Sequence, residues 1–230
     1  MAVIRVTILD DHPLIQHGIQ SLLSDSQDIE IVGAGGSGEE LRRLVEAHHP
    51  DVVLLDLNMP EQANAKRGAG NVFRPFEAMA WIINVSPQTR ILVISQHFDL
   101  TTVERAASAG VHGYLLKDDR LTEHLADAVR SVYRGGAYFS AAVSEMLHRP
   151  LSKTPPLSLT NRQLEVLQSI CASPNQSYSE HAAKLGIEEN TLRNHLRAIF
   201  ERLDVNNLAA AIIKASQMGL IDPTNPGMKP

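Results

Sequence analysis

The chain has 230 residues, a mass of 25.2 kDa and 43% hydrophobic residues, which is enough apolar material for one large domain or two small ones. No apolar run approaches the roughly 18 residues that a membrane span needs, and the single Cys171 excludes an internal disulfide; both features favour the reducing cytoplasm. The net charge of −5 is uneven, because residues 1–150 carry 19 acidic and 13 basic side chains whereas residues 151–230 carry 7 and 8. Any binding of nucleic acid must therefore come from a local basic face in the C-terminal part.

Five apolar segments alternate with helical patterns along the first part of the chain. The segment at residues 52–55 has four apolar residues without polar alternation, as expected for a central strand buried on both faces. The alternation predicts a parallel five-stranded sheet with helices on both faces. Strands are predicted at residues 3–9, 29–32, 52–55, 91–94 and 112–116, and helices at about residues 13–23, 39–48, 76–83, 100–109 and 121–134.

Two connections in this region differ from ordinary short loops. Residues 33–38 are rich in glycine and superficially resemble a dinucleotide-binding loop, but we favour a plain connection in which Ser37 or Gly38 caps the next helix, and we assign no nucleotide. Residues 61–75 lack a hydrophobic period, which indicates an extended loop, and they contain three cations: Lys66, Arg67 and Arg74.

A change of composition follows the last predicted strand and helix. A short helix is expected at about residues 140–148, and a Pro- and Ser-rich linker continues to residue 158. Beyond the linker the pattern is helical throughout, which indicates a second, all-α domain.

Polar side chains follow four of the five predicted strands: Asp10 and Asp11, Asp56, Ser95, and Lys117. Each alone has an ordinary explanation as a turn residue, a helix cap or a solvated cation. Because the carboxyl ends of parallel strands share one edge of the sheet, we expect these residues to converge. Three carboxylates there indicate a hard divalent cation, and Mg²⁺ is the natural occupant. With a hydroxyl and an ammonium beside it, Asp56 would be the nucleophile that forms an acyl phosphate.

The motifs VTILDDHPLIQHG, VVLLDLNMP, ILVIS and GYLLKD closely resemble those of the receiver domains of two-component response regulators, over residues 3–134. The resemblance implies a flavodoxin-like (βα)5 fold in which a sensor histidine kinase phosphorylates Asp56. It also implies the roles of the remaining residues: Mg²⁺ is bound directly by Asp11 and Asp56, with support from Asp10 and with the backbone carbonyl of Asn58 as a further ligand, the phosphate is contacted by Ser95 and Lys117, and Tyr114 is the aromatic switch. The connection from Asp56 to Ser95 is longer than is usual in that family, and residues 61–75 form the apparent insert. The insert is either a tolerated surface addition or a means of choosing the kinase or contacting a second copy.

The C-terminal part has the pattern of a helix-turn-helix. Thr160 suits the N-cap of a helix, Ser177 and Glu180 have capping-box spacing, and Gly186 fits the turn. A solvated face would explain the arginines of the next helix as well as a groove-reading face does. That helix, at about residues 190–203, places Leu192, Leu196, Ile199, Phe200 and Leu203 inward, and Arg193, Asn194 and Arg197 outward.

The segments LTNRQLEVL, SYSEHAAKLGIEENTLRNHLRAIFERL and AAIIKASQMGLI resemble the LuxR-type DNA-binding domain of NarL/FixJ-class regulators, over about residues 157–221. The resemblance implies a four-helix domain in which the major groove is read by Arg193, Asn194 and Arg197, while Thr191 and Arg202 lie near phosphates. Three positions depart from the pattern: Gln163 replaces a usual glutamate, Glu188 stands where a small capping residue is common, and Leu208 stands where an arginine is usual. The gained glutamate and the lost arginine both weaken attraction to phosphates.

These features predict a transcription regulator of the two-component type, and not an enzyme. The expected parts are a receiver domain (1–136), a linker with a short helix (137–156), a DNA-binding domain (157–224) and a tail (225–230). Phosphorylation would draw Ser95 and Tyr114 inward, favour a homodimer and free the DNA-reading helix from the receiver, so that the dimer binds double-stranded DNA. We expect the dimer face on the first and fifth receiver helices and on the last helix of the chain.

Two other functions are less favoured. The first is a phosphorylation-independent interaction protein whose receiver pocket is vestigial or blocked by the insert; the intact acidic pair, Ser95 and Lys117 argue against it. The second is a phosphatase with an aspartyl intermediate, which is disfavoured because no separate general acid follows Asp56 at near spacing.

Overall fold

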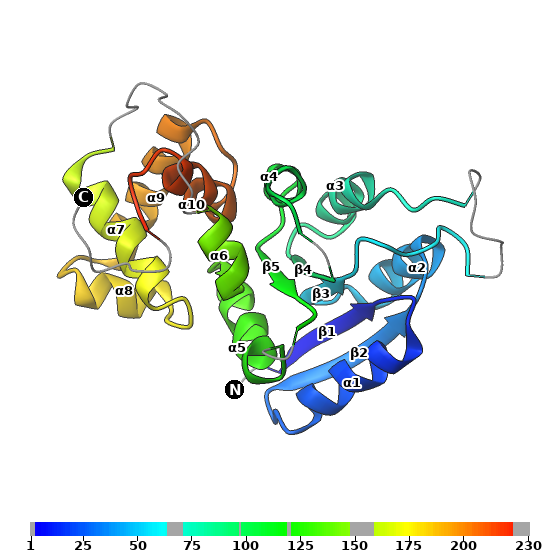
Figure 1. Cartoon of the computed structure of the whole chain (residues 1–230). Helices are drawn as coiled ribbons and strands as arrows, with labels where there is room; N and C mark the ends of the chain where they lie inside the picture. The colour runs from blue at the N-terminus through cyan, green and yellow to red at the C-terminus, as the bar shows by residue number, and fades with distance from the viewer. Residues whose placement is uncertain (1–2, 64–70, 97, 119–120, 148–158, 223–230) are drawn as a thin grey trace.

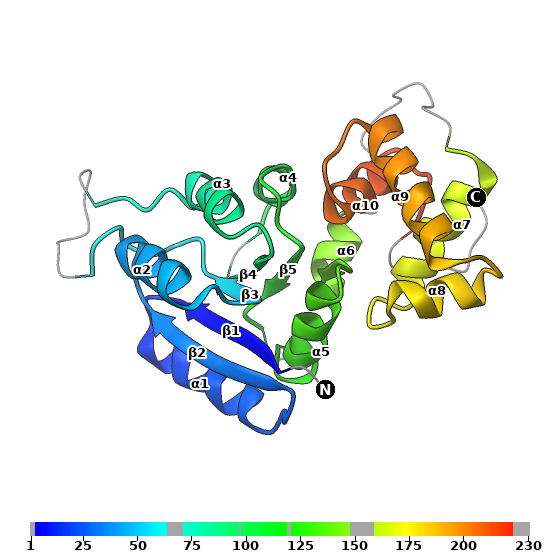
Figure 2. The ribbon, with the colours of Figure 1, turned by 180° about the vertical axis from the view of Figure 1, so that it is seen from behind.

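The N-terminal part of the chain forms one parallel sheet covered by helices on both faces (Figures 1 and 2). The computed structural model describes residues 3–63, 71–96, 98–118, 121–147 and 159–222. The strand order is β2-β1-β3-β4-β5-β6, which confirms the predicted flavodoxin-like arrangement. The strands are β1 (Ile4–Leu9), β2 (Ile29–Gly35), β3 (Val52–Leu55), β4 (Arg90–Ser95), β5 (Gly113–Leu116) and β6 (Tyr138–Phe139).

The sixth strand was not predicted. β6 has two residues and pairs in parallel with β5, with Tyr138 beside Gly113. A Cβ atom at Gly113 would lie 2.4 Å from the Tyr138 carbonyl oxygen, so this close approach requires glycine. The chain reaches this position through Gly135, whose φ of +86° turns the backbone after the preceding helix. Two residues are too few to show a strand period, and the sheet therefore has one strand more than the sequence pattern indicated.

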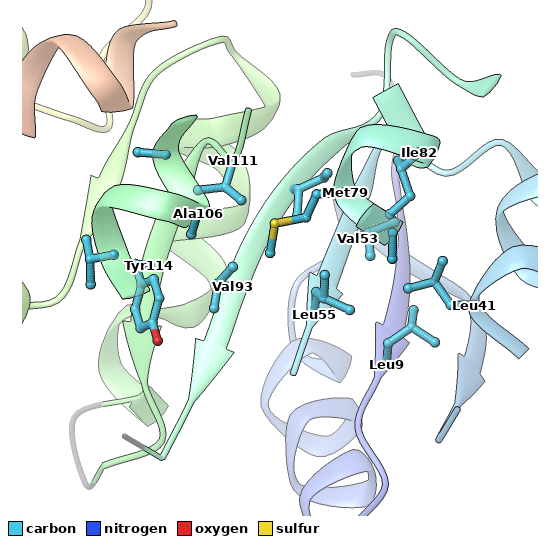
Figure 3. Packing of buried hydrophobic residues seen from close by; sticks show 14 of the residues in the cluster. Leu9, Leu41, Val53, Leu55, Met79, Ile82, Val93, Ala106, Val111 and Tyr114 are labelled. Atoms are coloured by element: carbon cyan, nitrogen blue, oxygen red, sulfur yellow. The ribbon is translucent and has the colours of Figure 1, made fainter. Parts of the chain in front are cut away.

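Two hydrophobic layers cover the sheet. On one face, Ile8 and Leu54 pack against α1 (Pro13–Ser24) and α5 (Leu121–Tyr133). On the other face, Leu9 and Leu55 lie toward α2 (Gly38–His48) and α3 (Pro75–Val85), and Val93 lies toward α4 (Leu100–Ser108), as Figure 3 shows. Successive strand residues therefore serve opposite layers, and this explains the unbroken apolar run in β3.

The glycine-rich connection after β2 is a helix cap, as we favoured. The Ser37 hydroxyl accepts a hydrogen bond from the Glu40 backbone N–H at 3.2 Å. The N–H groups of Gly38 and Glu39, which a phosphate-binding loop would offer to a ligand, donate to the Pro60 and Glu61 carbonyl oxygens, each at 3.0 Å. The start of α2 is thus already occupied by the chain that follows β3.

The C-terminal part is all-α, with its own hydrophobic core. Thr160 is the N-cap of α7 and Ser177 forms a capping box at α8, both as predicted, and Thr160 forms a capping box as well. Gly186 has a φ of +66° in the turn between α8 and α9. The helices are α7 (Asn161–Ala172), α8 (Tyr178–Lys184), α9 (Glu189–Leu203) and α10 (Leu208–Gln217), and α6 (Ala141–Leu147) precedes them as expected. None of the helices within the described ranges is both long and apolar enough to cross a bilayer.

The C-terminal part is docked on the N-terminal part through α10. Ala210 and Ile213 of α10 join the hydrophobic layer beside α4 and α6. The Asn207 amide donates to the Ala107 carbonyl oxygen at 2.9 Å, while its Oδ1 caps α10 by accepting from the Ala210 N–H at 2.8 Å. At a second contact, the Tyr178 hydroxyl donates to the Gly135 carbonyl oxygen at 2.5 Å. The docking thus combines the apolar contact of α10 with hydrogen bonds from Asn207 and Tyr178 to backbone carbonyl oxygens of the N-terminal part.

The insert is an open loop only in part. The chain is paired across the base of the insert, through an antiparallel bridge between Pro60 and Val72. The buried Phe73 follows this pair and leads into α3. Residues 64–70, with the cations Lys66 and Arg67, lie outside the described residues, as do residues 148–158, which include the Pro- and Ser-rich part of the predicted linker.

Candidate functional site

Four neighbouring strands deliver the predicted polar residues to one edge of the sheet. Asp10 and Asp11 follow β1, Asp56 follows β3, Ser95 ends β4, and Lys117 follows β5. Backbone hydrogen bonds fix these positions, since the Asp56 N–H donates to the Leu9 carbonyl oxygen at 2.8 Å and the Lys117 N–H donates to the Ser95 carbonyl oxygen at 2.9 Å. The structure therefore brings the five residues together.

A buried ion triad forms the centre of this site. Lys117 Nζ lies 2.6 Å from Asp10 Oδ2 and 2.8 Å from Asp56 Oδ2. Asp10 is 1% exposed and Asp56 is 4% exposed. Because unpaired buried carboxylates are costly, the shared ammonium compensates the burial of both side chains.

Three carboxylates and an imidazole crowd the same space. One ligand atom each from Asp10, Asp11, His12 and Asp56 lies within 4.8 Å of the others. With His12 neutral, the three carboxylates and the Lys117 ammonium leave two negative formal charges. Oxygen donors with this charge fit Mg²⁺, which prefers a few carboxylates completed by water and carbonyl oxygens.

His12 was not predicted as a site residue. Its Nδ1 lies 2.8 Å from Asp11 Oδ1 and 3.5 Å from Asp10 Oδ1, and its backbone N–H donates to Asp10 Oδ1 at 3.0 Å. Imidazole nitrogen is a poor ligand for Mg²⁺, so His12 is better suited to orient Asp11 than to bind the ion. The sequence feature that could have identified His12 is its position directly after Asp10 and Asp11.

Asn58 lies beside the acidic cluster in the loop after β3. Its backbone N–H donates to Asp56 Oδ1 at 3.3 Å. This contact holds the loop against the carboxylate.

Tyr114 is fully buried beside β4 (Figure 3). Burial raises the pKa of its hydroxyl above the ordinary value, and a side-chain hydrogen bond with Ser95 opposes this shift. The ring therefore already has the inward position that we expected phosphorylation to induce.

The predicted DNA-reading face lies on α9. The buried residues of this helix are Leu192, Leu196, Ile199 and Leu203, and its exposed residues include Thr191, Arg193, Asn194, Arg197 and Arg202. The inward and outward sets agree with the predicted faces, except that Phe200 is only partly buried. Contact with the receiver is made mainly by α10, so the expectation that docking itself would cover the α9 face is not supported for Arg193 and Asn194.

Neighbouring side chains already hold Arg193 of α9. Arg193 donates to Glu189 Oε1 from Nε at 2.9 Å and from Nη2 at 2.6 Å, and its guanidinium lies 4.9 Å from the centre of the Tyr178 ring. Arg197 shares a hollow with Ser108 of α4. A base contact by Arg193 would therefore require it to leave Glu189.

The three departures from the family pattern have different structural consequences. Gln163 is buried and its Oε1 accepts from the Thr160 N–H at 2.9 Å, so it completes the capping box as glutamate would. Glu188 is the N-cap of α9, and within the described residues its side chain makes no capping hydrogen bond. Leu208 is buried in the core of the C-terminal part. The last two positions therefore lack a phosphate-facing donor.

Comparisons with known proteins agree with both halves of the chain. Residues 6–130 match the family described as response regulator receiver domain, and residues 157–215 match bacterial regulatory proteins, luxR family. The chain is 33% identical over 224 residues to a probable transcriptional regulatory protein NarL of Mycobacterium tuberculosis, covering 95% of this chain and 96% of the relative. It is also 30% identical over 240 residues to the transcriptional regulatory protein DegU of Brevibacillus brevis, covering 95% of each.

Solved structures share the fold. A structure of the RcsB response regulator of Salmonella typhimurium aligns with a TM-score of 0.55 at 21% identity, covering 92% of this chain and 97% of that one. A LuxR-family response regulator from Aurantimonas sp. aligns with a TM-score of 0.54 at 23% identity, covering 63% of this chain and 95% of that one. Together with the sequence matches over both halves, these results show that the chain belongs to the response regulators that join a receiver domain to a LuxR-type DNA-binding domain.

Proposed function

We propose that this response regulator is switched by phosphorylation of Asp56 and regulates transcription through α9. The observation that carries the proposal is the buried triad in which Lys117 Nζ lies within 2.8 Å of both Asp10 and Asp56. A lysine ammonium, a serine hydroxyl and three carboxylates at one sheet edge suit the transfer of a phosphoryl group to a carboxylate. In this proposal the chain is divided as 1–136, 137–156, 157–224 and 225–230, and acts in the cytoplasm.

Asp56 is the phosphoacceptor in this mechanism. An oxygen of its carboxylate attacks the phosphorus of a phosphohistidine on a sensor kinase, a P–O bond forms, and the P–N bond breaks with its electron pair returning to the imidazole of the kinase. Asp10, Asp11, Asp56 and the Asn58 carbonyl would hold Mg²⁺, which when bound supplies positive charge beside the phosphoryl oxygens.

Lys117 and Ser95 then contact the phosphoryl group carried by Asp56. Lys117 Nζ needs little movement, because it already contacts Asp56 Oδ2. The Ser95 hydroxyl, which is bonded to Tyr114, can exchange that partner for a phosphoryl oxygen. Tyr114 is therefore the side chain through which a change at Asp56 reaches α4.

The output is carried by the docked C-terminal domain. α10 lies against α4, and eight residues of α10 are buried, from Leu208 to Ser216. A change of the α4 surface would release α10, and the released domain would pair with a second copy through α10, with α1 and α5 as the receiver face of the dimer. The dimer would then bind two half-sites of double-stranded DNA, with α9 of each copy in the major groove.

Incubation with Mg²⁺ and acetyl phosphate, followed by intact-mass measurement, tests the phosphoacceptor. We expect a phosphate adduct on the wild-type chain and none on Asp56→Asn. Asp28→Asn is the matched control, because Asp28 pairs with Arg130 at the other end of the sheet, and it should still be modified. An unmodified wild type would refute the phosphoacceptor and support regulation that is independent of phosphorylation.

Substitutions of two α9 arginines distinguish a contact with bases from a contact with phosphates. Arg197→Ala should weaken binding to a selected operator more than to random DNA, because a base contact is worth about 1–3 kcal/mol of discrimination. Arg202→Ala should weaken both equally and lower the salt dependence by about one unit. Equal losses on all sequences for Arg197→Ala would exclude base reading by that residue.

A further inference from the structure

The insert leaves and rejoins the receiver through a paired stem, which we define as residues 60–62 and 71–73. Asn71 closes the stem, because its Oδ1 accepts from the Gln62 N–H at 2.6 Å and its Nδ2 donates to the Gln62 carbonyl oxygen at 3.0 Å. Asn71 is 7% exposed, and burial of the two hydrogen bonds makes them costly to break. The stem is therefore a hydrogen-bonded structure and not the open loop that the sequence indicated.

The stem is seated on the first turn of α2. The Pro60 and Glu61 carbonyl oxygens accept from the first two N–H groups of that helix, and the Glu61 carboxylate pairs with Arg42. A Cβ atom at Gly38 would lie 2.4 Å from Glu61 Oε2 and 2.8 Å from Phe73 Cδ2. Both strands of the stem therefore meet α2 at Gly38, where a larger residue would not fit.

This seat fixes the short loop that follows Asp56. At one end, the Asp56 N–H is bonded to β1. At the other end, Pro60 is bonded to α2, and between them Met59 is 6% exposed and packed in the core. Asn58 lies inside this loop and donates to Asp56.

We propose that the stem is a positioning device that holds the Asn58 carbonyl toward the Mg²⁺ site. The inference rests on the proposed function, because it assigns the stem to the same metal site. Its physical basis is that the pairing of Gln62 with Asn71 closes the long connection a few residues after Asn58. Without the stem, Asn58 would belong to one long connection between β3 and α3, and its carbonyl would lose its fixed direction.

The competing explanation is that the stem only seals a surface insertion. The two explanations differ in their effect on Mg²⁺ affinity, since a seal would affect overall stability and leave the affinity unchanged. Melting temperature of the full chain measured against Mg²⁺ concentration reports that affinity without any phosphorylation.

Asn71→Ala is the decisive variant. It removes the two side-chain hydrogen bonds to Gln62, and we expect the Mg²⁺ concentration for half-maximal stabilisation to rise about threefold to tenfold. The rate of modification by acetyl phosphate at low Mg²⁺ should fall by a similar factor and recover at saturating Mg²⁺. Arg130→Ala is the control, because it breaks hydrogen bonds to Asp28 at the opposite end of the sheet; it should lower the melting temperature and leave the Mg²⁺ dependence unchanged.

Arg42→Ala provides a second and milder variant, in case the first does not fold. It removes the ion pair to Glu61 and should shift the Mg²⁺ dependence in the same direction, with recovery in Arg42→Lys. Wild-type Mg²⁺ affinity in folded Asn71→Ala, or in Arg42→Ala if the first variant is unfolded, would overturn the inference while leaving the proposed function intact. A wild-type chain that gains no stability from Mg²⁺ would instead overturn the metal site on which both depend.

Discussion

Replacing Asp11 with asparagine should stabilise the chain without divalent cations and remove most of its response to Mg²⁺. Asp11 faces two carboxylates, those of Asp10 and Asp56, and the Lys117 ammonium is placed between those two. Because the Lys117 ammonium lies between Asp10 and Asp56, it compensates only part of the repulsion between Asp11 and these two carboxylates. The change removes this repulsion and also removes a ligand.

The magnitude follows from the geometry. Two unit charges at the 4.8 Å limit of this cluster repel by about 3.5 kcal/mol at an effective dielectric constant of about 20. Residual solvation of Asp11, whose side chain is 10% exposed, and the lost contact with His12 reduce this gain. We expect a net stabilisation of about 1 kcal/mol, which is about 3 °C in melting temperature for a chain of this size.

Thermal unfolding in EDTA and in excess Mg²⁺ measures both effects. Asp11→Asn should melt above the wild type in EDTA and gain little from Mg²⁺. Asp28→Asn, which loses the 2.8 Å contact with Arg130, should melt lower in both buffers and keep the full Mg²⁺ gain. The reasoning fails if Asp11→Asn melts below the wild type in EDTA and still gains as much from Mg²⁺.

Three further substitutions test individual contacts. Burial, reinforced by Arg90, lowers the pKa of His112 to about 3 from 6.5, so stability is complete above pH 6.5 and falls below it, by at most about 1.4 kcal/mol per pH unit. His112→Asn should flatten this slope in urea unfolding, and an unchanged slope would assign it to other groups. Thr7 Oγ1 is buried without a hydrogen-bond partner among the described residues, so Thr7→Val should raise the unfolding free energy by about 1 kcal/mol; a decrease would contradict this. Asn207→Ala should cost about 1 kcal/mol as a lost cap and speed limited proteolysis between the domains, whereas unchanged proteolysis would show that the bond to Ala107 does not hold the docking.

The strand ends were predictable because few arrangements satisfy the pattern. Apolar runs that end in Asp56, Ser95 and Lys117 must lie side by side in a parallel sheet, and this places their side chains together. The caps at Ser37 and Thr160 were predictable because they depend on neighbours three residues away.

The features that the sequence did not reveal depend on non-local contacts. β6 is two residues long, and its pairing depends on a glycine 25 positions earlier in the chain, at Gly113. The stem joins Gln62 to Asn71 through a side-chain amide, which has no hydrophobic period. Docking of α10 on α4 depends on small residues such as Ala210, whose pattern also suits an ordinary core helix. His12 was missed because an exposed histidine beside two aspartates has many ordinary explanations.

Tyr178 touches both the receiver and the DNA-reading helix, through Gly135 and Arg193. In the proposed mechanism, docking and the reading of bases by Arg193 therefore share one side chain, and their equilibria are linked. Linkage between two binding events is reciprocal. If docking of the receiver lowers the affinity for DNA by a given factor, bound DNA therefore lowers the equilibrium constant for docking by the same factor. Operator occupancy would then act as an input to the receiver, and a promoter would help to set the signalling state of the regulator that binds it.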